Sequence, residues 1–186
     1  MKKLILASAS PRRKEIFNLL GLSFDIKPSS KEPPMKDGED VREAVLRSAR
    51  TKAEDIFENN LDCVVVGADT VVVFDGCALG KPKDTADAQN MLKTLSGREH
   101  EVLTGVFVCS PQMKKGFVST TCVEFFELSD NEIEEYVKSG EPMDKAGAYG
   151  IQGRGLRLVK GIVGDFYNVV GFPAAEFIRT FGEELK

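Results

Sequence analysis

The chain has 186 residues, of which 42% are hydrophobic, and its formal net charge is −4. This length and apolar fraction predict one domain of ordinary size, residues 1–186, and they exclude global disorder. An acidic chain binds polyanions poorly, so we expect neither a nucleic-acid polymer nor a membrane surface as partner.

The cysteines, the histidine and the N-terminal residues narrow the possible chemistry. Four cysteines are widely spaced without a CxxC pair, which favours buried, reduced thiols. His100 is the only histidine, which argues against a multi-histidine zinc site and leaves one candidate base for a Ser-His-Asp triad. The apolar run 4–7 is too short, and too soon followed by charge, for a signal peptide, so a cytoplasmic location is expected.

The first elements bring hydroxyls and cations together. Residues 4–7 predict a buried strand, and Ser10 with Pro11 predicts the start of a helix that Gly21 ends. Cations in a first helical turn oppose the helix dipole, but a bound anion would reverse that penalty. The groups that would converge on such an anion are free backbone N–H groups, the hydroxyls of Ser8 and Ser10, and up to three positive charges from Arg12, Arg13 and Lys14. The alternative interpretation is a solvated basic turn.

The next segments contribute two isolated charges. A second short strand is predicted over 24–26, and the Pro-rich segment 28–38 is predicted to be a loop that contains Glu32. A loop glutamate is usually solvated. Residues 40–59 have the apolar period of a long helix, and Lys52 lies within its apolar stripe. This lysine either extends its ammonium to solvent or points into a cleft.

The central stretch holds the least expected residue. The apolar runs 64–66 and 71–74 each have the length of a buried strand, and Asp69 lies between them. Burying a lone carboxylate is costly, so Asp69 needs a cation, a donor network or a catalytic role. Asp75-Gly76 predicts a turn, and Lys81 is a candidate partner cation.

The remaining pattern predicts a mixed α/β fold. The expected elements are a helix capped by Asp84 or Thr85, a hairpin of strands 102–109 and 117–127 with an interruption at 104–105, a helix opened by the capping box 129–132, an irregular segment 140–155, a strand 156–159, a turn 160–165 and a C-terminal helix with Phe177, Ile178 and Phe181. A long irregular segment in a compact domain is usually functional.

The scattered charges suit a triphosphate. The cations expected in one cleft are Arg12, Arg13, Lys52, Lys81 and Arg98. Asp69 and Glu32 would either hold a divalent metal ion or activate water. Gln152, in the irregular segment, can both donate to and accept from a base edge. The P-loop, GxGxxG and GxSxG motifs are all absent from the chain.

Six blocks of the sequence resemble the signatures of the Maf family. They are ASASPRR at 7–13, GADTVV at 67–72, GKP at 80–82, SGREH with TG at 96–105, DKAGAYGIQG at 144–153 and FYNVVGFP at 166–173. The blocks occur in family order over nearly the whole chain. The match also resembles the Maf-like region of the vertebrate acetylserotonin methyltransferase-like protein.

This resemblance implies an inosine-triphosphatase-like α/β fold, with a twisted mixed sheet flanked by helices and two lobes around a deep cleft. It implies a house-cleaning hydrolysis of a nucleoside triphosphate to the monophosphate and pyrophosphate, with a divalent cation such as Mg²⁺, Mn²⁺ or Co²⁺. The form Ile151-Gln152-Gly153 resembles the branch that acts on dTTP and UTP rather than on 7-methyl-GTP. CTP and modified pyrimidine nucleotides are further expected substrates, and the family tends to form homodimers.

The resemblance also implies roles for single residues. Asp69 matches the proton acceptor, and the positions tied to substrate choice are Arg12, Thr70 and Gln152. Glu32, Lys52 and Lys81 match polar positions of the cleft. Many members carry an acidic pair where this chain has Lys31-Glu32, so one carboxylate is missing there.

Four alternatives stay open at this stage. Asp69 could be only a metal ligand, with a metal-bound hydroxide as the attacking group. The chain could be a non-catalytic nucleotide-binding regulator of cell division. It could also be a pyrophosphatase for deaminated purine nucleotides, which the Ile-Gln-Gly form argues against. The fourth alternative is a simple structural domain, which would leave Asp69 and the N-terminal arginines unexplained.

Overall fold

A computed structural model describes residues 3–36 and 38–185 of the chain. Its strands are β1 (Leu4–Leu6), β2 (Phe24–Ile26), β3 (Val64–Phe74), β4 (Cys77–Leu79), β5 (Glu99–Cys109), β6 (Lys114–Phe125) and β7 (Val159–Val163). Its helices are α1 (Pro11–Leu19), α2 (Val41–Phe57), α3 (Thr85–Leu95), α4 (Asp130–Lys138), α5 (Phe166–Val170) and α6 (Ala174–Phe181), with the 3₁₀ turns η1 (Glu141–Asp144), η2 (Ala146–Ala148) and η3 (Gly153–Arg157).

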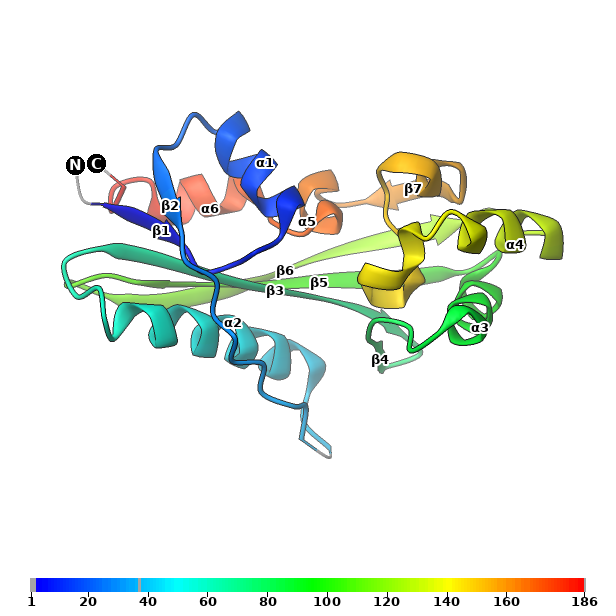
Figure 1. Ribbon diagram of the computed structural model, residues 1–186, viewed down its shortest axis with the longest axis horizontal. Helices are drawn as coiled ribbons and strands as arrows, with labels where there is room; N and C mark the ends of the chain where they lie inside the picture. The colour runs from blue at the N-terminus through cyan, green and yellow to red at the C-terminus, as the bar shows by residue number, and fades with distance from the viewer. Residues whose placement is uncertain (1–2, 37, 186) are drawn as a thin grey trace. The chain divides into compact units, whose positions relative to one another are not determined.

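The described strands form one mixed sheet (Figure 1). The order is β2-β1-β3-β5-β6-β7, and β4 pairs with β3. Strand β1 runs parallel to both β2 and β3, whereas β7 runs antiparallel to β6. The predicted α/β class with a mixed sheet flanked by helices is therefore confirmed. The described helices include none that is both long enough and apolar enough to cross a membrane.

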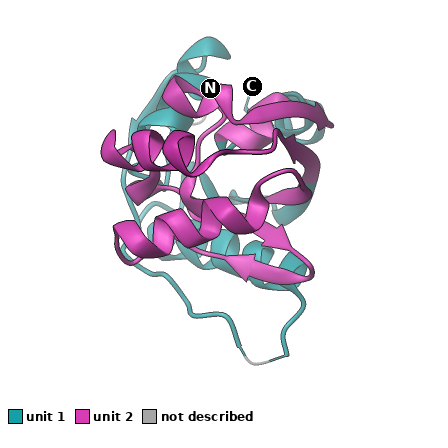
Figure 2. Ribbon diagram, turned by 90° about the vertical axis from the view of Figure 1, so that its right-hand side faces the viewer, with its two compact units in different colours: residues 1–70, 104–119, 171–186 teal, residues 71–103, 120–170 magenta. Residues whose placement is uncertain are grey.

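The chain divides into two compact units, coloured separately in Figure 2. Unit 1 holds residues 1–70, 104–119 and 171–186, and unit 2 holds residues 71–103 and 120–170. Strands β3, β5 and β6 each begin in one unit and continue into the other, so the division follows packing and not chain order.

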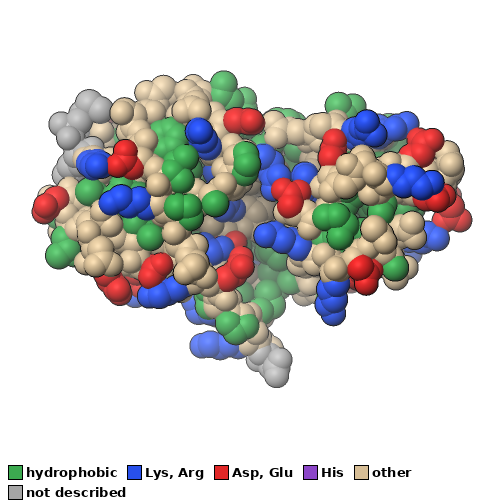
Figure 3. Space-filling view, in the orientation of Figure 1, with side chains coloured by type: hydrophobic (Ala, Val, Ile, Leu, Met, Phe, Trp, Pro, Cys, Tyr) green, Lys and Arg blue, Asp and Glu red, His purple; other side chains and the backbone are tan. Residues whose placement is uncertain are grey.

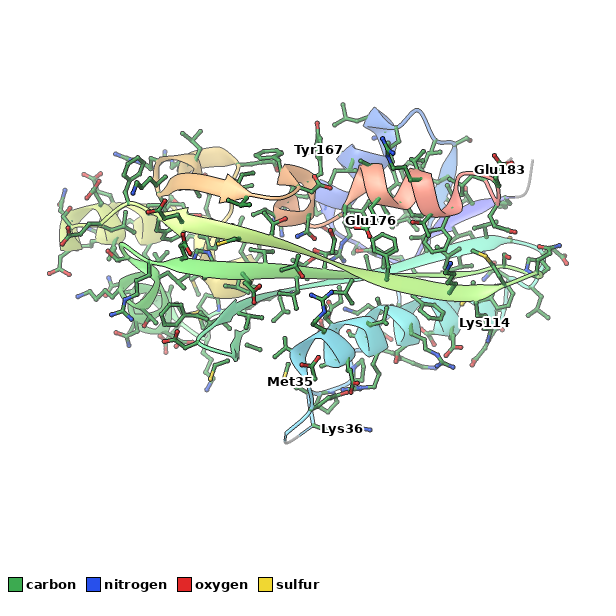
Figure 4. All side chains as sticks on the ribbon, turned by 180° about the vertical axis from the view of Figure 1, so that it is seen from behind. Met35, Lys36, Lys114, Tyr167, Glu176 and Glu183 are labelled. Atoms are coloured by element: carbon green, nitrogen blue, oxygen red, sulfur yellow. The ribbon has the colours of Figure 1, made fainter. Side chains whose placement is uncertain are left out.

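Unit 1 has an apolar cluster under α2. It consists of Ile5, Ala7, Ala49, Ala53, Phe57, Val65, Phe107 and Cys109. Alanines at 49 and 53 lie on one face of the helix and let the strands approach closely. Lys114, labelled in Figure 4, adds an ion pair to Glu54 at 3.2 Å and lies over the Phe57 ring.

A second cluster of unit 1 is aromatic and joins the two ends of the chain. The ring of Phe17 on α1 packs against Phe24, Phe172 and Phe177, with centroids 4.9 to 5.8 Å apart. Phe181 contacts Phe177 and Phe117 in turn. Tilted and edge-on arrangements of this kind add to the stabilisation that comes from buried area.

The central stretch is one strand and not the two that the apolar runs suggested. Residues 67 to 70 continue the β3 ladder from Val64 to Phe74 without a break. The reason is packing, because Gly67 lies against the backbone of α2. A Cβ at position 67 would clash with Ala49 O and would lie 2.7 Å from Ala53 N. The glycine therefore marks a close approach of helix and strand and not a turn.

Strand β5 corrects the prediction in the same way. It is continuous from Glu99 to Cys109, although an interruption was expected at residues 104–105. A Cβ on Gly105 would lie 2.7 Å from Val45 O of α2, so this glycine also admits the helix. Both misplaced breaks follow from treating glycine as a turn signal when it marks a close packing contact.

Unit 2 confirms most of the predicted caps and turns. Asp84 caps α3 by accepting from Asp87 N, and Ser129 and Glu132 form the predicted capping box of α4. Asp75 and Gly76, both with positive φ, form the two-residue loop between β3 and β4. The strand β4 after this turn was not predicted.

Three other expectations for unit 2 are wrong. The predicted strand 156–159 lies mostly in η3, and β7 begins at Val159, where pairing with β6 becomes available. The predicted turn 160–165 therefore holds most of β7. Of the four cysteines, Cys109 alone is buried, whereas Cys63 and Cys122 are half-buried and Cys77 is exposed, although all four are free thiols as expected. Helix α5 was not predicted, because five residues are too few to show a helical period.

We expect Gly67→Ala to lower the free energy of unfolding by about 1–3 kcal/mol, because the added methyl overpacks the α2 contact. Urea denaturation measures the change. The matched control is Gly161→Ala in β7, where a Cβ meets nothing within 4 Å. Equal stability of the Gly67 and Gly161 variants would contradict this account of the helix–strand contact.

Candidate functional site

The site in unit 1 follows from the alternation of side chains along β3. Val65, Gly67 and Asp69 face α2, as their contacts with Ala49, Ala53 and Lys52 show. Successive residues of a strand point to opposite faces, so Thr70 faces the other side, where it meets Arg13 of α1. The two residues that the sequence places side by side therefore act on opposite faces of the sheet.

The Asp69 carboxylate is held by a lysine from α2. Lys52 Nζ lies 2.8 Å from Asp69 Oδ1, and the two side chains are 11% and 27% exposed. The cation that pairs with Asp69 in unit 1 is Lys52. The candidate from the sequence, Lys81, lies in unit 2. Lys52 occupies the apolar stripe because its stem packs there while its ammonium reaches the carboxylate. Asp69 stays partly exposed, as a carboxylate that meets water or substrate must be.

Glu32 lies at the same ammonium. Its Oε1 is 3.5 Å from Lys52 Nζ, and its side chain is exposed. One cation thus already sits against the two carboxylates that the sequence assigned to a metal. Among the residues that the structure describes, no group of three or more His, Cys, Asp or Glu side chains could hold a metal by itself. Two carboxylates fit a Mg²⁺-type ion whose remaining ligands are water and substrate phosphates.

The lysine that replaces an expected acidic residue has a different partner. Lys31 Nζ lies 2.8 Å from Asp55 Oδ1 of α2, and Ser29 Oγ donates to Asp55 Oδ2 at 2.6 Å. The hydrogen bond from Lys31 holds the pKa of Asp55 below its usual value. Lys31 therefore ties the segment that carries Glu32 to α2. Further along this segment, Met35 and Lys36 lie at the projecting loop below α2 in Figure 4.

Arg13 joins three separate parts of unit 1 on the other face. Its Nε donates to Gly171 O at 2.9 Å, Nη1 to Ser8 Oγ at 3.1 Å and Nη2 to Thr70 Oγ1 at 3.1 Å. Thr70 Oγ1 also lies 3.0 Å from Thr104 Oγ1 of β5. Burial lowers the pKa of Arg13, and the negative charge of Asp69 opposes that shift. The guanidinium positions Thr70, one of the residues expected to govern substrate choice.

The other residues predicted at this end are also placed. Ser10 is the N-cap residue of α1, but its side chain makes no capping hydrogen bond, and its N–H donates to Ser8 Oγ at 3.2 Å. Arg12 is half-buried in the first turn. Sequence reasoning missed Thr104 and Gly171 as partners of Thr70. The alternation of side chains along β5 shows on which face of the strand Thr104 lies, but it does not show that Thr104 lies opposite Thr70.

We expect Arg13→Lys to lower the free energy of unfolding by about 1–3 kcal/mol, because one ammonium cannot serve three acceptors in the fork geometry of a guanidinium. Chemical denaturation measures the loss. Arg179→Lys on the exposed face of α6 is the control. A stability as high as that of the control would show that the three hydrogen bonds contribute little.

Three predicted site residues lie in unit 2, and all three are exposed: Lys81, Arg98 and Gln152. The Arg98 guanidinium lies over the Phe74 ring, 5.5 Å from its centroid. Lys81 follows Gly80, whose carbonyl oxygen accepts from Gly147 N at 3.0 Å. This backbone contact joins the Lys81 segment to the glycine-rich segment 140–155.

His100 is not the base of a Ser-His-Asp triad. The side chain is 3% exposed, and its Nε2 lies 2.7 Å from the Tyr149 hydroxyl. Its ring packs edge-on against Phe125 and Tyr149. Burial lowers the pKa of His100 to about 4, so it is a neutral core residue at neutral pH.

This pKa shift predicts a pH dependence of stability. The unfolded chain binds a proton at His100 below its usual pKa of 6.5, whereas the folded chain does so only near 4. The contribution of neutral His100 to the free energy of unfolding is therefore complete above about pH 6.5 and is lost as the pH falls toward about 4. We expect the free energy of unfolding to fall by about 2 kcal/mol between about pH 7 and about pH 5. His100→Leu should remove this slope, and a slope that persists would assign it to other groups.

Charges of both signs are interspersed over the face drawn in Figure 3.

Comparison with known proteins gives a consistent result. A family model described as Maf-like protein matches residues 3–184. Proteins of Bacillus pumilus and Bacillus velezensis, both described as dTTP/UTP pyrophosphatase, are each 49% identical to the chain over 98% of its length, which spans 98% and 96% of the relatives. A solved nucleoside-triphosphatase / dITP/XTP pyrophosphatase of Mycobacterium abscessus is 14% identical, with a TM-score of 0.48 over 98% of this chain and 96% of that one. A likeness that weak supports no conclusion here, so the inosine-triphosphatase-like form and its cleft stay predictions.

Proposed function

Since the chain belongs to the Maf-like protein family, we propose that it hydrolyses dTTP and UTP to the monophosphate and pyrophosphate. The observation that carries the proposal is the identity of 49% to dTTP/UTP pyrophosphatases over nearly the full length of both chains. The geometry of unit 1 supports it, because Asp69 is a partly exposed carboxylate with a fixed orientation, next to a lysine and a second carboxylate.

In the proposed reaction, Asp69 orients a water molecule toward the α-phosphorus and accepts its proton. Lys52 holds Oδ1, so Oδ2 is the oxygen assigned to the proton. Because the ion pair with Lys52 already fixes the Asp69 carboxylate, less entropy is lost when the carboxylate and the water reach their reactive positions. The bond from the α-phosphorus to the bridging oxygen then breaks, and pyrophosphate leaves.

A divalent cation is part of the proposal. Asp69 and Glu32 would hold it together with the substrate phosphates, because they are the two carboxylates that converge on one positive charge. When bound, such a cation neutralises charge that develops on phosphate oxygens. Its identity as Mg²⁺, Mn²⁺ or Co²⁺ is left to metal titration.

The remaining roles are assigned by residue type. Arg12 and Lys81 are proposed to neutralise the phosphates that leave, and Arg98 adds positive charge. Three residues have supporting roles in the proposal. Arg13 donates to Thr70 and to Ser8, and Ser8 accepts from the N–H of Ser10 at the start of α1. Gln152 is proposed to contact the base, since a carboxamide can donate to a carbonyl oxygen and accept from an imide N–H of thymine or uracil.

We also propose a cytoplasmic house-cleaning role and a homodimer as the working form. The acidic composition and the nucleotide substrate support a partner set without nucleic-acid polymers or membranes. CTP and modified pyrimidine nucleotides remain candidate substrates of the same chemistry.

We expect Asp69→Asn to lower pyrophosphate release from dTTP and UTP by about 10²–10⁴-fold, because the amide cannot accept the proton. Release is followed by a coupled pyrophosphate assay with Mg²⁺ or Mn²⁺, and nucleotide affinity by calorimetry. Binding should persist in the variant.

Asp75→Asn is the matched control, because this residue lies in the exposed turn after the same strand and asparagine suits its positive φ. Full turnover by Asp69→Asn would remove Asp69 from the mechanism. Tight binding without turnover of any nucleotide by the unaltered chain would favour a non-catalytic nucleotide-binding regulator instead.

A further inference from the structure

The turn that presents Gln152 is held by a carboxylate from η1. Gln152 is the extended residue before η3, and Gly153 and Arg154 follow it with Gly153 at φ 64°. Arg154 N donates to both oxygens of Glu141, at 3.1 Å to Oε1 and 3.0 Å to Oε2. The Glu141 side chain thus satisfies the first backbone donor that this turn offers after Gly153.

Gly153 also fits Glu141 by shape. A Cβ at position 153 would lie 2.9 Å from Glu141 Oε2 and 3.0 Å from Oε1. The positive φ and the carboxylate therefore both require glycine at 153. A side chain there would displace either the carboxylate or the turn.

Glu141 is itself held firmly. Its N–H donates to Ser139 Oγ at 3.2 Å, and its carbonyl oxygen accepts from Lys145 Nζ at 2.6 Å. Lys145 Nζ also pairs with Asp144 at 2.6 Å. On the N-terminal side of Gln152, Gly150 N donates to the buried Tyr136 hydroxyl at 3.2 Å. The backbone on both sides of Gln152 is therefore attached to α4 and the turn that follows it.

We propose that Glu141 is a positioning residue for base selection, acting through the 152–154 turn on the Gln152 carboxamide. This inference rests on the proposed function, since it deepens the role of Gln152. Gln152 is exposed, so its backbone is the part that the protein fixes. A carboxamide distinguishes thymine from cytosine only when its donor and acceptor are oriented, because the two bases differ in the polarity of one edge.

The test compares kcat/KM for dTTP with kcat/KM for dCTP, two substrates that share their sugar and phosphates. We expect Glu141→Ala to lower the dTTP/dCTP ratio of kcat/KM by about tenfold or more, because a misplaced Gln152 carboxamide loses its contact with thymine. Both a higher KM and a lower kcat for dTTP should contribute. Glu141→Gln keeps an oxygen that accepts from Arg154 N and should retain the ratio within about threefold. Glu134→Ala on the exposed face of α4 is the matched control.

A double-mutant cycle isolates the pathway of the effect. If Glu141 acts through Gln152, Glu141→Ala should not change the dTTP/dCTP ratio further in a Gln152→Ala background. A further change of the ratio in that background would overturn the proposal. An equal loss of kcat/KM for both nucleotides would also overturn it, since that outcome shows a structural role only.

Gly153→Ala gives a second route if Glu141→Ala does not fold. It should lower the ratio as Glu141→Ala does, because its methyl meets the carboxylate. An unchanged ratio in a folded Gly153→Ala protein would contradict the inference. Failure of the proposed function looks different: the unaltered chain would then release no pyrophosphate from either nucleotide.

Discussion

The ion pair between Lys52 and Asp69 is the interaction around which unit 1 is arranged. A carboxylate in the middle of a β-strand is stabilised by a cation, and that cation comes from an element that packs on the same face of the sheet. Helix α2 supplies it, because Ala49, Ala53 and Gly67 let the helix approach β3 closely. The small residues and the charged pair are therefore parts of one arrangement.

Glycines allow close contacts at the proposed functional side chains in both units. Gly67 and Gly105 admit α2 to the sheet, whereas Gly153 makes room for the Glu141 carboxylate. In each case the missing Cβ is replaced by an atom from another segment. The glycine-rich character of the segment 140–155 thus reflects close packing and defined turns as well as backbone freedom.

The alternation of β3 places Asp69 and Thr70 on opposite faces of the sheet within unit 1. Asp69 faces α2 with Lys52, and Thr70 faces α1, where Arg13 fixes it. The two faces are still coupled electrostatically, because the negative charge of Asp69 opposes the lowering of the Arg13 pKa by burial.

Local patterns alone determined much of this protein. Ser10-Pro11, Asp84, the capping box at Ser129 and the turn at Asp75-Gly76 act over a few residues, so the chain carries them without tertiary help. The out-of-place carboxylate Asp69 was equally visible, since hydropathy along one strand reveals it.

Other features were decided only by packing between distant segments. The continuity of β3 and β5, the start of β7, and the partners of Asp69 and Arg13 depend on residues far away in the chain. The sequence suggested Lys81 as a cation for Asp69, whereas the residue that pairs with Asp69 in unit 1 is Lys52. A sequence shows which residue needs a partner, but the partner is chosen by which surfaces can approach closely enough to meet.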